Sequence, residues 1–172
     1  MEIRQTNRND WKLIRPILHD VFGNGDTYPH SPDTPESAEH DYWIVSPTAS
    51  YVAVERGNVV GSYYLKPNQP GLGSHVANAG FIVKRSKRGL GIGRAMGRHS
   101  LFEAKRLGFM ALQFNLVVST NTASLKLWRS LGFSVVGTLP LAFNHNVFGY
   151  VDAFVMYRLL DDIEIGVLER VK

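Results

Sequence analysis

Hydrophobic and polar positions follow two different periods along this chain, which predicts both helices and strands. A strand is expected over residues 2–6, and a helix follows it. Asn9 or Asp10 is expected to cap this helix and Gly23 to end it. Its apolar positions recur at helical spacing: Trp11, Ile14, Leu18 and Val21.

The next segments predict a loop, a second helix and a β-hairpin. Clusters of glycine, proline and aspartate mark residues 23–35 as a loop, and exposed loops of this kind often hold substrate. A helix is expected over residues 35–45. The period then changes to two, which predicts strands over 51–55 and 59–65 joined by a tight turn.

The rest of the chain alternates strands with helices, which indicates one mixed sheet of the α/β (α+β) class. Strands are expected over residues 75–83, 111–118, 133–138 and 149–159, and residues 139–148 read as a loop. Helices are expected over residues 91–107 and from Asn121 to Gly132. We expect residues 1–172 to form a single domain with its core over about 3–160.

Composition narrows the classes of function. The absence of cysteine excludes disulfides, thiolate metal sites and a cysteine nucleophile. No apolar run approaches the roughly 20 residues of a membrane span, and the N-terminus is unlike a signal peptide, so we expect a cytoplasmic protein without a membrane partner. The net charge is +4, and an acid-free segment that should attract an anion carries much of it. This segment holds Lys84, Arg85, Lys87, Arg88, Arg94 and Arg98.

A glycine-rich turn inside this basic segment is the most informative feature. Glycine lets the backbone approach a ligand, and the free N–H groups of a helix start point at whatever lies above them, which is a geometry that binds phosphate. Arg88 and Arg94 can add charge-assisted hydrogen bonds at its two ends. The glycines stand where a strand passes into a helix: Gly89, Gly91 and Gly93.

Other interpretations of this turn fit the spacing less well. An NTPase phosphate loop needs a lysine followed by Ser or Thr, which does not follow these glycines. A dinucleotide site needs G-x-G-x-x-G and an acid about 20 residues on, whereas this turn is G-x-G-x-G. A purely structural helix entry is disfavoured because alternating glycines form helices poorly. Nucleic acid is disfavoured because only Phe81 offers a stacking ring nearby.

The turn and a downstream helix together resemble the GCN5-related N-acetyltransferase (GNAT) family. Arg88-x-x-Gly91-x-Gly93 matches the family's coenzyme A signature, R/Q-x-x-G-x-G/A. The segment from Asn121 to Phe133 is similar to the family's N-x-x-A/S-x-x-x-Y-x-x-x-G-F helix. The resemblance covers roughly residues 3–160. It implies a largely antiparallel sheet of about seven strands with a central splay, flanked by about four helices.

The resemblance also implies which residues hold acetyl-coenzyme A (acetyl-CoA) as cosubstrate. Backbone N–H groups of the turn would hold the pyrophosphate: Arg88, Gly89, Gly91, Gly93 and Arg94. The pantetheine arm would pair with the preceding strand along Phe81, Ile82 and Val83. The facing helix would contribute Asn121, Ser124 and Trp128 to the coenzyme site.

This chain departs from the family where a proton donor is expected. The family often has a tyrosine at the position of Trp128, and its hydroxyl protonates the leaving thiolate. An indole N–H is too weak an acid for that step, so Trp128 is interpreted as wall and packing. Tyr150, Tyr63 and Tyr64 are the alternative tyrosines, and we single out Tyr150 as a catalytic candidate.

The general base is also open, because the strand over residues 75–83 carries no acid. His75 is the nearest titratable group, with a strand-edge surface position as its alternative. His99 falls on the apolar face of the long helix and is interpreted as a hydrogen-bonded core histidine. The histidines lack the close spacing of metal ligands and the family needs no metal, so none is expected.

Asn78 and Asn115 are polar residues inside strands, where asparagine is disfavoured. Their amides are candidates for orienting a small substrate by its carboxylate and for polarising the thioester oxygen, or they pair with backbone at a strand break. This pair resembles the subgroup of acetyltransferases that act on proline-like imino acids such as azetidine-2-carboxylate.

Three functions stay open from the sequence. The first is transfer of an acetyl group to a small amine, such as an amino or imino acid, by direct attack in a ternary complex. The second keeps this chemistry with a protein or peptide N-terminus as acceptor, which an open groove would favour. The third is a non-catalytic acyl-CoA-binding module. A homodimer through the last two strands is suggested by family analogy only.

Overall fold

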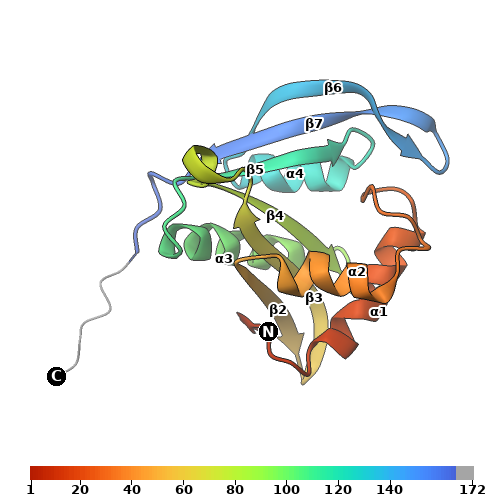
Figure 1. Cartoon of the computed structure of the whole chain (residues 1–172), viewed down its shortest axis with the longest axis horizontal. Coiled ribbons are helices and arrows are strands. Elements are labelled where there is room, and N and C mark those ends of the chain that lie inside the picture. The colour runs from red at the N-terminus through yellow and green to blue at the C-terminus, as the bar shows by residue number, and fades with distance from the viewer. Residues whose placement is uncertain (166–172) are drawn as a thin grey trace.

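Seven strands form one sheet in the computed structural model, which describes residues 1–165 (Figure 1). Their order is β1-β2-β3-β4-β5-β7-β6, and every neighbouring pair is antiparallel except β4 with β5. The strands are β1 (Glu2–Gln5), β2 (Ala49–Glu55), β3 (Asn58–Pro67), β4 (Val76–Val83), β5 (Ala111–Val118), β6 (Ser134–His145) and β7 (Gly149–Leu159). The predicted mixed, largely antiparallel sheet is confirmed.

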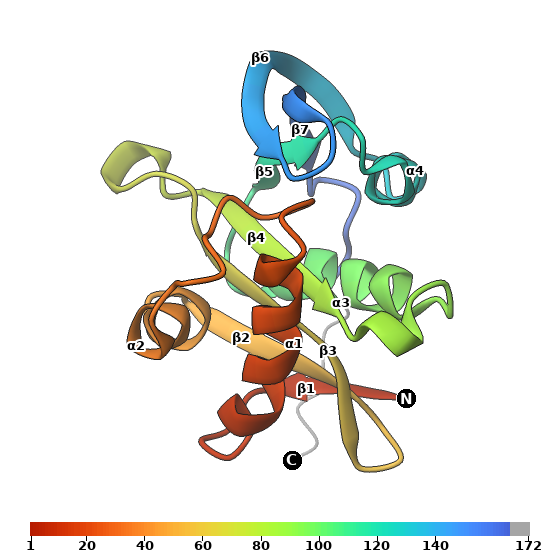
Figure 2. The ribbon, with the colours of Figure 1, turned by 90° about the vertical axis from the view of Figure 1, so that its right-hand side faces the viewer.

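Within residues 1–165, four α-helices cover the two faces of this sheet (Figure 2). They are α1 (Trp11–Gly23), α2 (Glu36–His40), α3 (Ile92–Arg106) and α4 (Thr122–Ser130). A π-helical turn over Asp41–Val45 continues α2 to the predicted end of the second helix. No helix within residues 1–165 is long and apolar enough to cross a bilayer.

Two hydrophobic cores lie on opposite faces of the sheet. Successive side chains of a strand point to opposite faces, so Tyr51 and Ala53 of β2 pack under α3 and α4 while Val52 between them packs under α1. In β3, Tyr63 and Tyr64 divide between the two cores in the same way. Because both faces are covered, these strands are apolar almost throughout, as buried strands are.

The sheet splits between β4 and β5. The two strands pair only where Val76–Asn78 meets Ala111–Gln113, and no register pair joins them beyond those positions. The pairing of β5 with β7 also shifts between Phe114 and Val117, which is a bulge beside the split. The expected splay is therefore present, and Figure 2 shows the two strands diverging.

The predicted end of β6 was wrong. Residues 139–148 were expected to form a loop, yet β6 continues to His145. Pro140 and Asn144 made this segment resemble a loop, but β6 is an edge strand, where proline is tolerated. Leu141 has a positive φ of 52°, and the register with β7 shifts between Leu139 and Phe143, so a bulge absorbs the irregularity.

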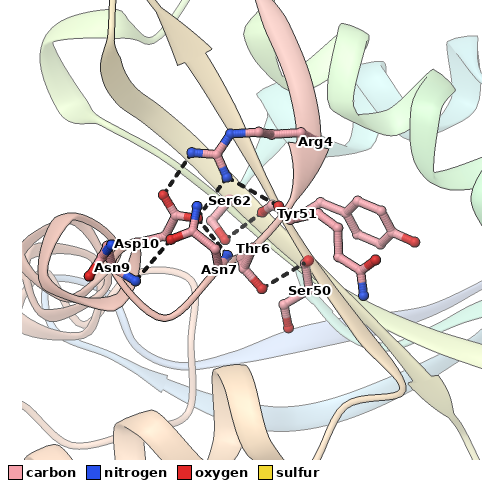
Figure 3. Close-up of polar contacts among 9 residues, drawn as sticks. Arg4, Thr6, Asn7, Asn9, Asp10, Ser50, Tyr51 and Ser62 are labelled. Atoms are coloured by element: carbon pink, nitrogen blue, oxygen red, sulfur yellow. Dashed lines mark hydrogen bonds and ion pairs between the residues drawn. The ribbon is translucent and has the colours of Figure 1, made fainter.

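Asp10 stands at the N-cap of α1 but its side chain does not cap the helix. Its carboxylate instead accepts hydrogen bonds from Arg4 Nη1 at 2.7 Å, Arg4 Nη2 at 2.8 Å and the Asn7 N–H at 2.7 Å (Figure 3). Asp10 is 3% exposed, and hydrogen bonding to Arg4 lowers the pKa of its carboxyl group. The contact ties β1 to the start of α1.

Candidate active site

A cavity of about 950 Å³ follows the split between β4 and β5. One end is the glycine-rich turn before α3, and its wall also includes the loop after α1 and the tip of the β6–β7 hairpin. Thirteen of the fourteen residues predicted for the site line it. They are Asn78, Phe81, Ile82, Val83, Arg88, Gly89, Gly91, Gly93, Arg94, Asn115, Asn121, Ser124 and Trp128.

The remaining candidate, Tyr150, does not line the cavity. It lies at the start of β7, paired with Asn144, and its side chain is 69% exposed. Of the two alternative tyrosines, Tyr63 is buried in the core and bonds His99 Nδ1 at 2.6 Å, whereas Tyr64 lines the cavity. The fold therefore brings only Tyr64 of these three hydroxyls to the site.

The turn at the start of α3 presents an open surface of backbone N–H groups. Gly89 and Gly91 have φ values of 77° and 81°, in the left-handed region that favours glycine. No atom lies within 4 Å of a Cβ built on either residue, so the space above them is open. The first bond of α3 runs from the Ala95 N–H to Gly91 O, which leaves the N–H groups of residues 92–94 without helical acceptors. This geometry suits a diphosphate.

Backbone groups of β4 point into the split. Hydrogen-bonded and non-bonded residues alternate in an antiparallel pair, and the Lys84 N–H bonds to Val60 O across β3. Phe81 and Val83 therefore turn their N–H and C=O groups away from β3, towards the missing partner strand. The Tyr28 hydroxyl donates to Phe81 O at 3.1 Å. An extended arm with amide groups can pair with this edge.

The helix α4 forms the other wall of the cavity at the end of the glycine-rich turn. Trp128 is 6% exposed, and its ring lies 4.8 Å from Phe81 and 4.5 Å from Phe114 between centroids, so it packs as predicted. Asn121 Oδ1 accepts the Ser124 N–H at 3.1 Å, which makes Asn121 the helix cap that the sequence indicates, while it also lines the cavity.

The two asparagines are held differently at the other end. Asn78 is 8% exposed, donates from Nδ2 to Gln113 O at 3.0 Å and accepts from the Tyr64 hydroxyl at 3.4 Å. Asn115 is exposed and donates from Nδ2 to Asn68 Oδ1 at 2.7 Å. Asn115 Oδ1 also accepts from Gln113 Nε2 at 2.8 Å. The amide of Asn78 is thus fixed by backbone and Tyr64, and the amide of Asn115 by two side chains.

Titratable side chains complete this end, and of these only Tyr64 is a candidate from the sequence. Burial raises the pKa of the hydroxyls of Tyr28, Tyr42 and Tyr64, so all three are neutral donors. Burial, followed by the charge of Lys66, lowers the pKa of His30, so its ring is neutral near pH 7. The only available signal was the predicted substrate loop over residues 23–35, which contains Tyr28 and His30.

Besides His30, the only histidine that lines the cavity in residues 1–165 is His145. His75 is exposed and its Nδ1 contacts Leu72 O, which fits the surface alternative. His99 is half-buried beside Tyr63, as expected of a core histidine. His145 lines the cavity, and its Nδ1 accepts the Val147 N–H at 3.1 Å. No group of three or more potential metal ligands occurs in residues 1–165.

The tip of the β6–β7 hairpin meets the loop between α1 and α2 (Figure 1). The Asn146 N–H donates to Gly25 O at 3.1 Å, and Asn146 Nδ2 donates to Asn24 O. Residues on both sides of this joint line the cavity, including His30 and Phe148. The joint therefore bridges the cavity at the end where the asparagines lie.

Comparisons with known proteins agree with this geometry. Residues 11–133 match the family model described as acetyltransferase (GNAT) family. The chain is 35% identical over 159 residues to the N-acetyltransferase aca1 of Schizosaccharomyces pombe, an alignment that covers 90% of this chain and 72% of that protein. A structure of a GCN5-related N-acetyltransferase from Kribbella flavida has a TM-score of 0.88 and 42% identity, covering 92% of this chain and 96% of that one. The structure of yncA from Salmonella typhimurium with its cofactor acetyl-CoA shares the fold, with a TM-score of 0.82 and 23% identity over 96% of each chain.

Proposed function

The chain belongs to the acetyltransferase (GNAT) family and is an acetyl-CoA-dependent N-acetyltransferase, and we propose that its acceptor is the amine of a small amino or imino acid. The observation that carries the proposal is the shape of the cavity. It joins a diphosphate-binding turn to a bridged end lined by amides and neutral tyrosines.

The coenzyme end is assigned to the residues of the turn, β4 and α4. The N–H groups at residues 88–94 hold the diphosphate, with Arg88 and Arg94 supplying positive charge. The backbone edge at Phe81 and Val83 pairs with the pantetheine arm, which would share or replace the bond from the Tyr28 hydroxyl at Phe81 O. Asn121, Ser124 and Trp128 form the facing wall, and in this proposal the thioester lies in the split near Asn78.

The transfer needs no covalent enzyme intermediate. The amine nitrogen bonds to the thioester carbonyl carbon, the carbon–sulfur bond breaks, the proton that the amine loses passes to water, and the coenzyme leaves as its thiol once the sulfur is protonated. Trp128 has no acidic proton for the sulfur. We assign this step to Tyr64 in place of Tyr150, because Tyr64 lines the cavity and Tyr150 does not.

The amides of Asn78 and Asn115 are assigned to positioning. Asn78 is anchored by Gln113 O and faces the split, so its amide can orient the acceptor without losing its own geometry. Asn115 is held by side chains alone, and its Nδ2 can exchange the bond to Asn68 for one to a ligand while Gln113 still donates to its Oδ1. A carboxylate is a suitable partner for these donors, which supports an amino or imino acid.

The joint between Asn146 and Gly25 supports a small acceptor over a peptide. A peptide N-terminus needs a groove through which the rest of its chain can leave, whereas this joint bridges the acceptor end. A thiol-release assay with amino acids, imino acids, polyamines and short peptides tests the proposal. We expect amino or imino acids to release coenzyme A fastest. If only peptides cause release of coenzyme A, the acceptor is a peptide and not an amino or imino acid. If coenzyme A binds but no amine is acetylated, the chain is a binding module.

We also propose that the chain forms a homodimer. The edge strand β6 carries exposed apolar side chains, including Val136, Leu139 and Leu141. Such a surface suits a homodimer through the last two strands. Light scattering during size exclusion would give the mass, and a monomer at micromolar concentration would exclude this assembly.

A further inference from the structure

Lys66 is a positive charge inside the acceptor end of the cavity. It lies near the end of β3, directly opposite Asn78 of β4 in the antiparallel register. Residues that face each other across two strands project from the same side of the sheet, so the ammonium and the Asn78 amide share one face. Both side chains line the cavity, and Lys66 is half-buried.

The ammonium is directed over two aromatic rings instead of into solvent. Lys66 Nζ lies 5.1 Å from the ring centroid of Tyr42 and 5.4 Å from that of Tyr64. Cation–π contacts of this kind hold a lysine in place but leave its N–H donors without acceptors. The two hydroxyls bond each other at 2.8 Å, and Tyr64 also donates to Asn78.

Lys66 forms no ion pair with any carboxylate of residues 1–165. The other basic side chains of the cavity wall, Lys87, Arg88 and Arg94, belong to the segment around the turn, and Lys87 pairs with Glu55. Asp26 is the one carboxylate that lines this cavity in residues 1–165, and it forms no ion pair with Lys66, so the ammonium has no paired counter-charge in the described chain. A half-buried charge without a partner is costly, and a ligand that brings an anionic group removes that cost.

We propose that Lys66 is a specificity-determining residue that binds an anionic group of the acceptor, most simply the carboxylate of an amino or imino acid. This inference rests on the proposed function and adds a residue to it. The ammonium pairs with the carboxylate, and the amides of Asn78 and Asn115 bind its remaining lone pairs. The acceptor amine is then directed along β4 towards the split, where the thioester lies.

The test compares acids with their amides. Each L-amino acid, and proline, is titrated against its carboxamide by calorimetry on the protein loaded with coenzyme A, and by thiol release with acetyl-CoA. We expect the wild type to favour the acid at least about tenfold, the factor for a hydrogen bond to a charged group. The amine of a carboxamide is less basic than that of the acid, so a larger fraction of it is unprotonated and can attack. This difference acts against the expected preference for the acid.

The variant K66Q removes the charge, K66R keeps it, and K12Q makes the same change of net charge on the exposed face of α1. In K66Q we expect the preference to fall to about threefold or less, through a weaker Kd and higher KM of the acid, with the amide little changed. K66R should restore most of the preference and K12Q should keep all of it. Unchanged affinity for coenzyme A would show that K66Q is folded.

Two outcomes would overturn the proposal: equal binding of acid and amide by the wild type, or an undiminished preference in folded K66Q. In either case the role of Lys66 is limited to its cation–π contacts with the rings of Tyr42 and Tyr64. The calorimetric arm needs no turnover, so the results are separable. Selective binding of acids without thiol release would support Lys66 while contradicting the proposed acetyl transfer, and thiol release without selectivity would do the reverse.

Discussion

Asn78 and Asn115 are alike in sequence, but the fold anchors only Asn78 to backbone. The amide of Asn115 bonds two side chains, those of Asn68 and Gln113, and it is an exposed residue of the cavity wall. We expect Asn115→Ala to lower kcat/KM for the acceptor about 10- to 100-fold, the loss expected for a hydrogen bond to a charged group. Coenzyme A affinity should change less than about twofold.

Asn144→Ala is the matched control, because Asn144 is also an exposed strand asparagine but lies outside the cavity wall. Steady-state kinetics and calorimetry on both variants decide the matter. Equal rates for the wild type and Asn115→Ala would reduce Asn115 to a structural residue of the bulge in β5.

The Arg4–Asp10 contact gives a pH-dependent prediction for stability. The lowered pKa of Asp10 means that its contribution is complete above its unfolded pKa of about 3.9 and is lost as the pH falls through the lower folded value. We expect Asp10→Asn to cost about 2 kcal/mol of unfolding free energy at pH 7. The difference from wild type should shrink below about pH 4.

Urea unfolding at several pH values measures this difference. The exposed Asp33→Asn is the control and should leave stability within about 0.5 kcal/mol of wild type. A cost that stays constant down to pH 2 would mean that the variant removes packing and not the charged contact.

The residues proposed to bind the coenzyme could be identified from sequence because they are local. Of those proposed to bind the acceptor, only Asn78 and Asn115 could be identified in this way. Spacing over a few positions marks the turn, since positive φ values demand glycine there. The acceptor end is assembled from separate segments, such as Tyr28 in a loop, Lys66 on β3 and His145 on β6. No spacing in the chain relates these positions, and Tyr150 was wrongly preferred to Tyr64 because neighbours in space are not neighbours in sequence.

The turn before α3, which we propose binds the coenzyme, can be tested by a single substitution. Gly91→Glu places a negative side chain in the open space above the N–H groups of residues 92–94. We expect coenzyme A affinity to fall at least about 100-fold, because several charge-assisted bonds to the diphosphate are lost together.

Gly108→Glu separates this effect from backbone strain. Gly108 also has a positive φ, 90°, with open space around its Cβ position, but it follows the far end of α3. Both variants should lose similar stability in thermal unfolding, whereas only Gly91→Glu should lose the coenzyme in calorimetry. Wild-type affinity in Gly91→Glu would remove the assignment of the turn.

Element boundaries were predictable wherever a glycine or a change of period marks them. The end of α4 at Gly132 and the turn between β2 and β3 are examples. The end of β6 was mispredicted because a proline such as Pro140 usually marks the end of a strand. Here the proline is tolerated because β6 is an edge strand of the sheet. Whether a strand lies at the edge or in the centre depends on the whole sheet, so no local sequence pattern predicts it.

The whole sheet is joined across its split by few backbone contacts. β1–β4 and β5–β7 meet through paired positions only at Val76–Asn78 and Ala111–Gln113. A bound coenzyme would add the missing pairing. We therefore expect it to slow amide hydrogen exchange at Phe81 and Val83 at least about tenfold, as new hydrogen bonds protect exposed amides.

The Ile82 amide is an internal control, because the alternation in β4 directs it to β3 with or without ligand. Its exchange should change much less than that of its two neighbours. Equal protection of all three amides would indicate general stiffening of the protein in place of pairing at the split.

The joint between Asn146 and Gly25 links segments that are synthesised far apart in time. A growing chain that has left the ribosome as far as α4 already contains every residue of the diphosphate turn. Its acceptor end is still unbridged, because the tip of the β6–β7 hairpin has yet to emerge. Contacts of such long sequence separation also form late in folding. A nascent chain would thus complete the turn proposed to bind the coenzyme before it encloses the end of the cavity proposed to select the acceptor.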